Sequence, residues 1–588
     1  MHRGKRVLSL LAVLSIAVAA SACGSTSATP APSTGASASA PAQNETYPRA
    51  ETLYSTGKQW GAPSTWNPLD PNAAMGVVGL QYETLFLYDP LKDAYTPWLA
   101  ASASWDTAKT TYTIKTRDGV KWSDGQAFTA DDVAFTINLA SIKAIGSNLL
   151  TYVDSASASD ASTVVVKFKA NPPYQEFAQW VYNSPILPKH IWSSKADENI
   201  LKDTNANGVG TGPYMYKTAS ADRMVWIRND NWWGAATNPV KPKYIVDIVN
   251  GANSVALGQL LAGNIDLSNN YFPGIAQILT GGYGITTYFD QAPYMLAGNT
   301  AVLVPNTAKK PLDDPAFRKA LATAINPDDI VVKDYGNIVA KADPSGLLPI
   351  FDKYIDKTQN AALNYSYDAA KAKQMLADAG YKTGSDGFVT NKDGSPINLQ
   401  LEVPDGWSDW MAAENMIAAS AKAAGINVTA AHPDYNTVVA DRNRPDDNTP
   451  AKFDLVINND VQVGNTPWTW YDYVFRSPLP SGAGENRNYE GYKNDAAWTL
   501  VQQLDKTPID DLATMKSICS QLQKIQLTDV PVIPLWYNGV WSQVSNAVWT
   551  NWPSDKGVQV LPATWNGYWQ MGAINMLTNL KPVPPPAS

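Results

Sequence analysis

Tryptophan is the residue type in this sequence whose number and placement indicate chemistry. The chain has 21 tryptophans, with none between Trp233 and Trp407, so they are not spread evenly as core residues. An indole ring can stack on the apolar face of a sugar ring while Asn, Gln and Asp side chains bond the sugar hydroxyls. We expect most of the 21 to lie in the core or at its rim. The candidates for ligand contact are the following: Trp60, Trp407, Trp410, Trp468 and Trp470.

The expected strands place these candidates at strand ends. Trp407 and Trp410 follow a segment, residues 397–403, in which apolar and polar residues alternate strictly. Trp468 and Trp470 follow a second strand pattern at residues 453–457. Loops at strand ends are where α/β folds hold their ligands. Trp60, after a strand that begins near Leu53, is expected to face the two pairs from the other side of a cleft.

Enzyme chemistry has little support in the sequence. Beyond the N-terminus the chain has only His190 and His432, and it has no GxSxG, HExxH or P-loop spacing. We therefore expect no enzyme activity, no cofactor and no metal. A glycosidase is the main alternative, because two carboxylates about 5 to 9 Å apart suffice for it and 53 acidic residues are present. A surface adhesin or signalling protein is a third class, and it predicts no tight binding of a small molecule.

Length and charge set broad limits. At 588 residues the chain should contain two or three core units. The net charge is -8, and no basic run occurs beyond the N-terminus. These values exclude the electrostatic pattern of a nucleic-acid-binding protein.

The N-terminal segment is typical of export. Arg3, Lys5 and Arg6 precede a short apolar run that ends in Ala20-Ser21-Ala22-Cys23. Small residues before a cysteine resemble a bacterial lipobox, which implies lipidation at Cys23 and a signal peptide over residues 1–22. A plain secretory signal is the alternative. Residues 23–46 are rich in Ser, Ala and Pro and are expected to be a flexible tether.

The most patterned stretch is residues 112–138. It combines an alternating strand, two Asp-Gly turns, Trp122, and a helix with Thr129 as its N-cap. This order resembles the signature block of the family 5 solute-binding proteins, the extracytoplasmic receptors of ABC importers. Further segments resemble the family in the expected order, so the resemblance covers nearly everything after residue 47: 186–192, 210–214, 228–233, 311–330, 367–381, 425–428, 489–494 and 530–535.

The second half of the chain alternates helices with strands. Asp314 with Pro315, and Asp368, predict helix starts, and Gly380 and Gly425 predict helix ends. This alternation predicts an α/β unit. The resemblance implies a two-lobed periplasmic-binding-protein fold of type II (Venus-flytrap) with an extra subdomain in lobe I. The expected parts are lobe I at 47–293 with the subdomain at about 106–209, lobe II at 294–540, a return to lobe I at 541–581, and a disordered tail at 582–588.

The ligand class is inferred from the segment 459–473. Peptide receptors of the family usually hold the ligand's ammonium group with a carboxylate here, whereas this chain has Asn465 and Trp468 at the expected positions, with Asp460 and Asp472 nearby. Residues 549–565 resemble the tail of members that bind cello-oligosaccharides. The resemblance therefore favours a β-linked oligosaccharide, with an oligopeptide as the alternative. It also implies that a monomer, anchored to the membrane by its lipid, delivers the ligand to permease subunits.

Overall fold

The structure is a computed structural model that describes residues 46–56, 63–70, 73–139, 152–195, 197–444, 446, 448–459, 464–479, 487–562, 564–565 and 572–584. Cys23 and Trp60, together with the predicted signal peptide, lie outside these residues. The described residues lie in one compact unit that spans residues 43–588. No helix in the described ranges is long and apolar enough to cross a membrane.

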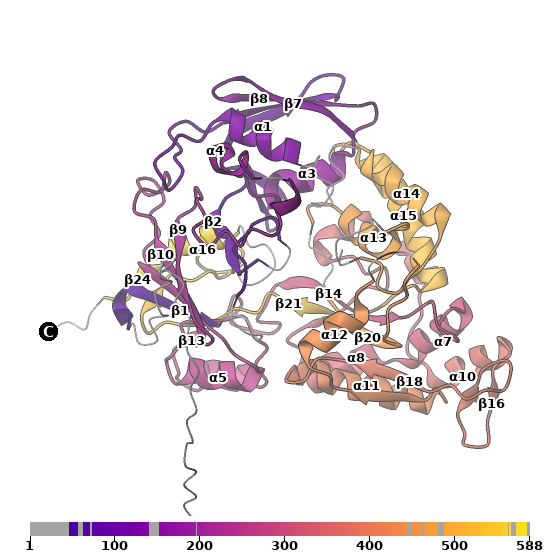
Figure 1. Cartoon of the computed structure of the whole chain (residues 1–588). Helices are drawn as coiled ribbons and strands as arrows, with labels where there is room; N and C mark the ends of the chain where they lie inside the picture. The colour runs from indigo at the N-terminus through magenta and orange to yellow at the C-terminus, as the bar shows by residue number, and fades with distance from the viewer. Residues whose placement is uncertain are drawn as a thin grey trace, which may run out of the picture. The chain divides into compact units, whose positions relative to one another are not determined.

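A seven-stranded sheet forms the centre of what we call lobe I (Figure 1). Its central strand β1 (Thr52–Thr56) is parallel to both of its neighbours, and the outer pairs are antiparallel. The strand order is β13 (Ile285–Thr286), β22 (Gln543–Ser545), β12 (Leu267–Ser268), β1, β11 (Tyr244–Ile248), β10 (Arg223–Arg228) and β9 (Tyr214–Ala219).

An antiparallel four-stranded sheet forms a subdomain between β1 and β9. Its order is β5 (Ala100–Trp105), β6 (Thr111–Thr116), β8 (Thr163–Phe168) and β7 (Val153–Asp160). Helix α1 (Ala130–Asn138) packs on β7 and β8. Thr129 caps this helix in a capping box with Asp132, as the sequence predicts. Four more elements complete this part of lobe I: β2 (Gly76–Tyr82), β3 (Phe86–Asp89), β4 (Ala94–Pro97) and α3 (Tyr174–Asn183).

A six-stranded mixed sheet forms the centre of lobe II. Its order is β15 (Ala340–Lys341), β21 (Ile533–Gly539), β14 (Ala297–Pro305), β20 (Leu455–Asn458), β18 (Leu399–Glu402) and β19 (Val428–Ala431). The predicted helix starts at Asp314 and Asp368 are confirmed, because each carboxylate accepts a backbone N–H of the helix that follows. The main helices are α7 (Pro315–Ala324), α10 (Ala369–Asp378), α11 (Ser408–Ala423), α12 (Tyr435–Arg442), α13 (Trp468–Phe475), α14 (Asp495–Asp505) and α15 (Leu512–Asp529).

The chain passes between the two sheets twice. It leaves lobe I after β13 and enters lobe II at β14, and it returns from β21 to β22 through the short connection at residues 540–542. Two adjacent crossings of this kind form a hinge between lobes. The strands β14 and β21 pair with each other, so both crossings meet at one edge of lobe II.

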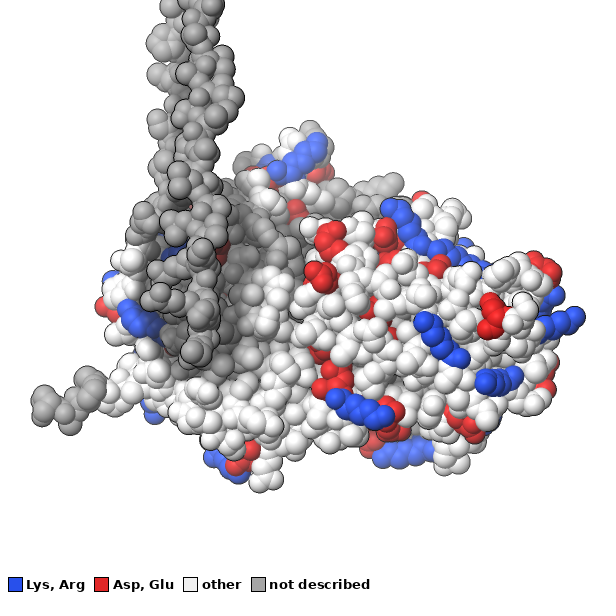
Figure 2. Space-filling view, turned by 90° about the horizontal axis from the view of Figure 1, so that it is seen from below, with Lys and Arg blue, Asp and Glu red and all other residues white. Residues whose placement is uncertain are grey.

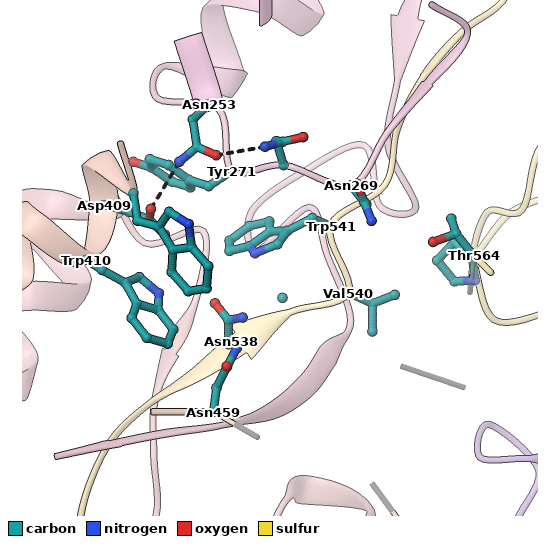
Figure 3. Close-up of a pocket in the computed structure, with 14 residues that line it drawn as sticks. Asn253, Asn269, Tyr271, Asp409, Trp410, Asn459, Asn538, Val540, Trp541 and Thr564 are labelled. Carbon is teal, nitrogen blue, oxygen red and sulfur yellow. Dashed lines mark hydrogen bonds between the residues drawn. The ribbon is translucent and has the colours of Figure 1, made fainter. Parts of the chain in front are cut away.

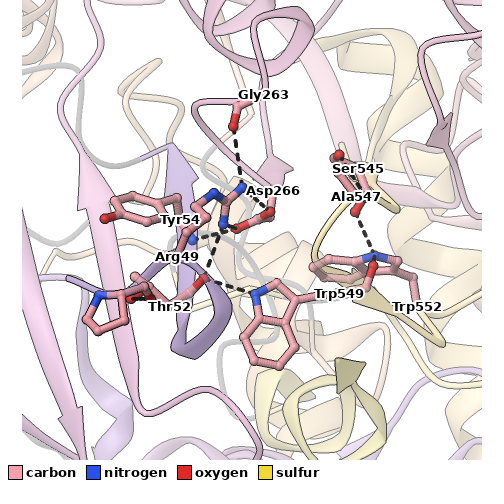
Figure 4. A network of polar contacts seen from close by, with 10 residues as sticks. Arg49, Thr52, Tyr54, Gly263, Asp266, Ser545, Ala547, Trp549 and Trp552 are labelled. Atoms are coloured by element: carbon pink, nitrogen blue, oxygen red, sulfur yellow. Dashed lines mark hydrogen bonds and ion pairs between the residues drawn. The ribbon is translucent and has the colours of Figure 1, made fainter. Parts of the chain in front are cut away.

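The C-terminal return is tied to the start of lobe I by buried polar contacts (Figure 4). The indole N–H of Trp549 donates to the carbonyl of Thr52 at 3.0 Å. Next to it, Arg49 binds both carboxylate oxygens of Asp266, at 2.7 and 2.5 Å. The indole N–H of Trp552 donates to the carbonyl of Ser545. The Trp549 bond fixes the last part of the chain against the first strand, and the other bonds hold the segments on either side of it.

Charged residues on the face in Figure 2 are of mixed sign. Lysine and arginine side chains lie between aspartates and glutamates over the described part of this face. No extended basic patch is visible on the described part of this face.

Candidate functional site

A cavity of about 190 Å³ lies where the lobes meet the β21–β22 connection (Figure 3). Lobe I, lobe II and the connection each contribute side chains to its walls. The lining residues are Asn253, Asn269, Asn270, Tyr271, Trp407, Asp409, Trp410, Asn459, Asn538, Gly539, Val540, Trp541, Pro562 and Thr564. The lining combines aromatic rings with neutral amides.

Two half-buried indoles face this cavity, one from the β21–β22 connection and one from lobe II. Trp541 lies on the connection, where Tyr271 meets it edge-on at 5.5 Å between ring centroids. Trp407 precedes α11 and packs edge-on against Trp410, at 4.7 Å and 80°. Both indoles are therefore held by other rings while part of each remains open to a ligand.

The turn before Trp407 brings the lobes close together. Gly406 has φ of +82°, and a Cβ there would lie 2.9 Å from the carbonyl oxygen of Gly251 in lobe I. Only glycine combines this backbone conformation with so close an approach. The position of Trp407 thus depends on a lobe contact that has no room for a side chain.

Asn253 of α5 (Asn253–Leu261) links the lobes at the cavity wall. Its amide nitrogen donates to Asp409 of α11 at 3.2 Å, and its amide oxygen accepts from Asn270 at 3.0 Å. Tyr335 donates its hydroxyl to the other carboxylate oxygen of Asp409 at 2.9 Å. Burial raises the pKa of Asp409 to about 6, and the hydrogen bond from Tyr335 opposes that shift. Asp409 is therefore an acceptor for neighbouring residues of the protein.

Further amides line the cavity near the hinge. Asn538 is the penultimate residue of β21, and its buried amide oxygen has no hydrogen-bond partner among the described residues. Asn459 directly follows β20. Asn269 accepts a hydrogen bond from Thr56 at the end of β1, at 2.8 Å. Uncharged donors and acceptors of this kind suit hydroxyl groups.

Trp565 anchors the last part of the cavity wall. Its indole nitrogen lies 2.9 and 3.1 Å from the two carboxylate oxygens of Asp247. Asp247 also accepts from the hydroxyl of Ser55 on β1. The neighbouring Pro562 and Thr564 are thereby held at the cavity.

The sequence-predicted ligand residues fall into three groups. Trp407 and Trp410 line the cavity. Asn465, Trp468 and Trp470 are buried elsewhere in lobe II and are not among the residues that line it. Trp60 belongs to a segment outside the described residues.

The prediction that Trp468 and Trp470 lie in a loop is wrong. They form the first turn of α13, a helix whose residues are all buried. Trp470 lies directly on Gly346, where a Cβ would be 1.8 Å from the indole ring. Asn465 donates to the hydroxyl of Tyr95 in lobe I at 2.5 Å. Several large aromatic side chains lie close together in α13, and burying their apolar surface stabilises the fold. They therefore pack in the core and do not line the ligand cavity.

Sequence reasoning did not identify Tyr271, Trp541 or the amides as site residues. Trp541 belongs to the group of six tryptophans between residues 536 and 569, and this clustering is the sequence feature that could have marked it as a site residue. Asn269, Asn270 and Tyr271 follow β12, which has only two residues, so no strand pattern marked its end.

The site offers little to an enzyme. Among the described residues that line the cavity, Asp409 is the one carboxylate, and it is engaged by Asn253 and Tyr335. In the described part of the chain no group of three or more His, Cys, Asp or Glu residues could hold a metal ion. The ring of His190 contacts the carboxylate of Asp124 at 2.7 Å, and Asp124 belongs to one of the two Asp-Gly turns predicted from the sequence.

Comparisons with known proteins agree with this architecture. Residues 94–480 match the family model described as bacterial extracellular solute-binding proteins, family 5 Middle. A crystal structure from Thermotoga maritima, described as a mannohexaose-bound oligopeptide ABC transporter, periplasmic oligopeptide-binding protein, is similar at 40% identity and a TM-score of 0.86. The match covers 91% of this chain and 99% of the Thermotoga maritima chain.

Two other relatives are more distant. The oligopeptide-binding protein AppA of Bacillus subtilis is 26% identical over 435 residues, which are 72% of this chain and 75% of that protein. Its structure in complex with a nonapeptide has a TM-score of 0.73 at 21% identity, covering 91% of this chain and 99% of that one. A probable ABC transporter-binding protein of Deinococcus radiodurans is 24% identical over 494 residues, 77% of this chain and 81% of that protein. This chain belongs to the bacterial extracellular solute-binding proteins of family 5, the substrate-binding proteins of ABC transporters, and it has their two-lobed α/β fold.

Proposed function

We propose that this protein captures an oligosaccharide between its lobes and delivers it to the permease of an ABC importer. The observation that carries the proposal is the cavity lining, in which the half-buried indoles of Trp407 and Trp541 accompany neutral amides. Indole faces suit the C–H faces of sugar rings, and amides suit hydroxyl groups. We propose a β-linked chain of hexoses, of the kind found in cello-oligosaccharides.

The comparison with the Thermotoga maritima structure supports this ligand class. That protein is described as bound to mannohexaose, and it is 40% identical to this chain. The nonapeptide complex of AppA is 21% identical. The higher identity supports a shared ligand class with the mannohexaose-bound protein. Several other relatives are named as peptide-binding proteins.

An oligopeptide is the second candidate, and the relatives' names favour it. A peptide in the cavity would bring an ammonium group that needs a carboxylate partner. Asp409 is buried, and Asn253 and Tyr335 already donate to it. The cavity therefore supports the sugar better than the peptide.

A ligand panel separates these candidates. The purified protein is heated with mannohexaose, cellohexaose and mixed peptides of two to nine residues, and the unfolding temperature is compared with that of the free protein. A ligand at about a hundred times its Kd adds roughly 2.7 kcal/mol to the free energy of unfolding. We expect a rise with the hexasaccharides and none with the peptides. A rise with peptides alone would refute the ligand class, and release of shorter sugars during incubation would indicate a glycosidase.

We also propose that the protein is anchored on the extracytoplasmic face of the membrane through lipid on Cys23. The support is the lipobox-like Ala20-Ser21-Ala22-Cys23 after an apolar run. Replacing Cys23 by Ala should release the protein from the membrane fraction. Retention of that variant in the membrane would contradict lipid anchoring at this position.

A further inference from the structure

Helix α3 lies beside α14 of lobe II (Figure 1), and the contact is made by its N-terminal end. Pro173 precedes the helix and provides no side-chain cap. The cap comes from the other lobe instead: the carboxylate of Asp505, at the end of α14, accepts the backbone N–H of Glu176 at 3.0 Å. A helix start needs such acceptors because its first N–H groups have no partner within the helix.

Two more contacts continue this junction. The amide nitrogen of Gln175, which is fully buried, donates to the carbonyl of Thr507 at 2.7 Å. Lys109 of lobe I forms an ion pair with Asp510 of lobe II at 2.6 Å. We call this set the α3 latch: Lys109, Gln175 and Glu176 of lobe I, and Asp505, Thr507 and Asp510 of lobe II.

The α3 latch is separate from the cavity. None of its members lines the cavity, and its contacts join the subdomain of lobe I to the connection between α14 and α15. The structure shows these contacts in one arrangement of the lobes. If the lobes separate at this junction, the Glu176 N–H and the Gln175 amide lose their acceptors in lobe II.

A contact made in one of two states shifts the equilibrium toward that state. Ligand held between the lobes needs the closed state, so stabilisation of that state tightens binding, and by the same factor as long as the closed state is the minor population. We propose that docking of the α3 N-terminus on residues 505–510 is a latch that sets how firmly the lobes close, without touching the ligand. This inference goes beyond the proposed function, since it holds for a sugar or a peptide.

Hydrogen exchange of the purified full-length protein tests the latch without a known ligand. Asp510→Lys places like charges opposite each other, and Asp505→Ala removes the cap. We expect each variant to exchange amide hydrogens about three- to tenfold faster at the start of α3. We expect a similar increase around Gly251 and Asn253, where the lobes meet on the cavity side.

Two further variants separate closure from local damage. Lys109→Asp combined with Asp510→Lys restores the ion pair in reverse and should restore slow exchange. Asp329→Lys removes a surface ion pair to Lys333 within lobe II and should leave lobe I unchanged.

Two results would overturn the proposal. One is unchanged exchange at α3 in both Asp510→Lys and Asp505→Ala. The other is faster exchange confined to α3, with none on the cavity side. Because the exchange is measured on the free protein, failure of mannohexaose to bind would count against the proposed function and not against the latch.

Discussion

Asn253 of lobe I donates a hydrogen bond to Asp409 of lobe II, 156 residues away, at 3.2 Å across the wall of the candidate site. The same Asn253 holds Asn270, which also lines the cavity. If the lobes separate, this bond breaks, so it couples the geometry of the site to the position of the lobes.

Replacing Asn253 by Ala should weaken ligand binding more than it weakens the fold. The variant loses the interlobe bonds to Asp409 and Ser408 and the bond to Asn270, so we expect the Kd for mannohexaose to rise about five- to tenfold. Titration calorimetry measures the change. Asn264→Ala is the control, because that exposed side chain bonds only Gln259 in the described structure. Equal affinities in all three proteins would show that the interlobe bond has no role in binding.

Truncation of Trp407 should weaken ligand binding, whereas truncation of Trp468 should destabilise the fold. Trp407→Ala removes a half-buried ring of the cavity, so we expect affinity to fall with little change in the unfolding temperature. Trp468→Ala removes a ring that is 2% exposed in the core of lobe II, so we expect the free energy of unfolding to fall by about 3–5 kcal/mol. Binding is followed by fluorescence and stability by denaturant titration. If Trp468→Ala abolishes binding while its stability is unchanged, the ligand lies on α13.

Glu83 should make stability depend on pH. Its buried carboxylate accepts the indole N–H groups of Trp98, Trp232 and Trp233, at 2.8, 3.2 and 2.9 Å. Burial raises its pKa from 4.5 to about 7, although these hydrogen bonds oppose the shift.

The direction of the effect follows from the raised pKa. The folded state holds a proton that the unfolded state has lost between about pH 4.5 and 7, so the free energy of unfolding falls as pH rises through that window. The loss reaches up to about 3 kcal/mol. Glu83→Gln should flatten this part of the profile in a comparison of unfolding at several pH values. A profile identical to that of the unaltered protein would exclude Glu83 as its source.

Trp565→Phe should loosen the end of the chain. The variant keeps an aromatic ring, but Asp247 loses the indole N–H donor, whose nitrogen lies 2.9 Å from its carboxylate. Loss of a hydrogen bond to a buried carboxylate costs about 1–3 kcal/mol. We expect a lower unfolding temperature and, because Pro562 and Thr564 line the cavity, weaker binding. Unchanged stability would mean that the return segment is fixed by its other contacts.

Local features of the fold could be predicted from the sequence. The caps at Thr129, Asp314 and Asp368 were predicted because a capping residue and the N–H that it accepts are only two or three positions apart.

The site was predicted only in part. Trp407 and Trp410 stood out because they follow a strongly alternating strand. Asn253, Tyr271 and Trp541 did not, since they come from segments almost 300 residues apart that only tertiary structure brings together. Trp468 was placed in a loop because a cluster of aromatics after a strand has no helical polar face, whereas α13 is buried on all sides and needs none.

The most direct test of the proposed function is a calorimetric titration of the purified protein with mannohexaose and with cellohexaose. We predict saturable binding in the micromolar range, about -8 kcal/mol, to at least one of them, and its loss in Trp407→Ala. No heat of binding with either sugar, alongside tight binding of an oligopeptide, would contradict the account.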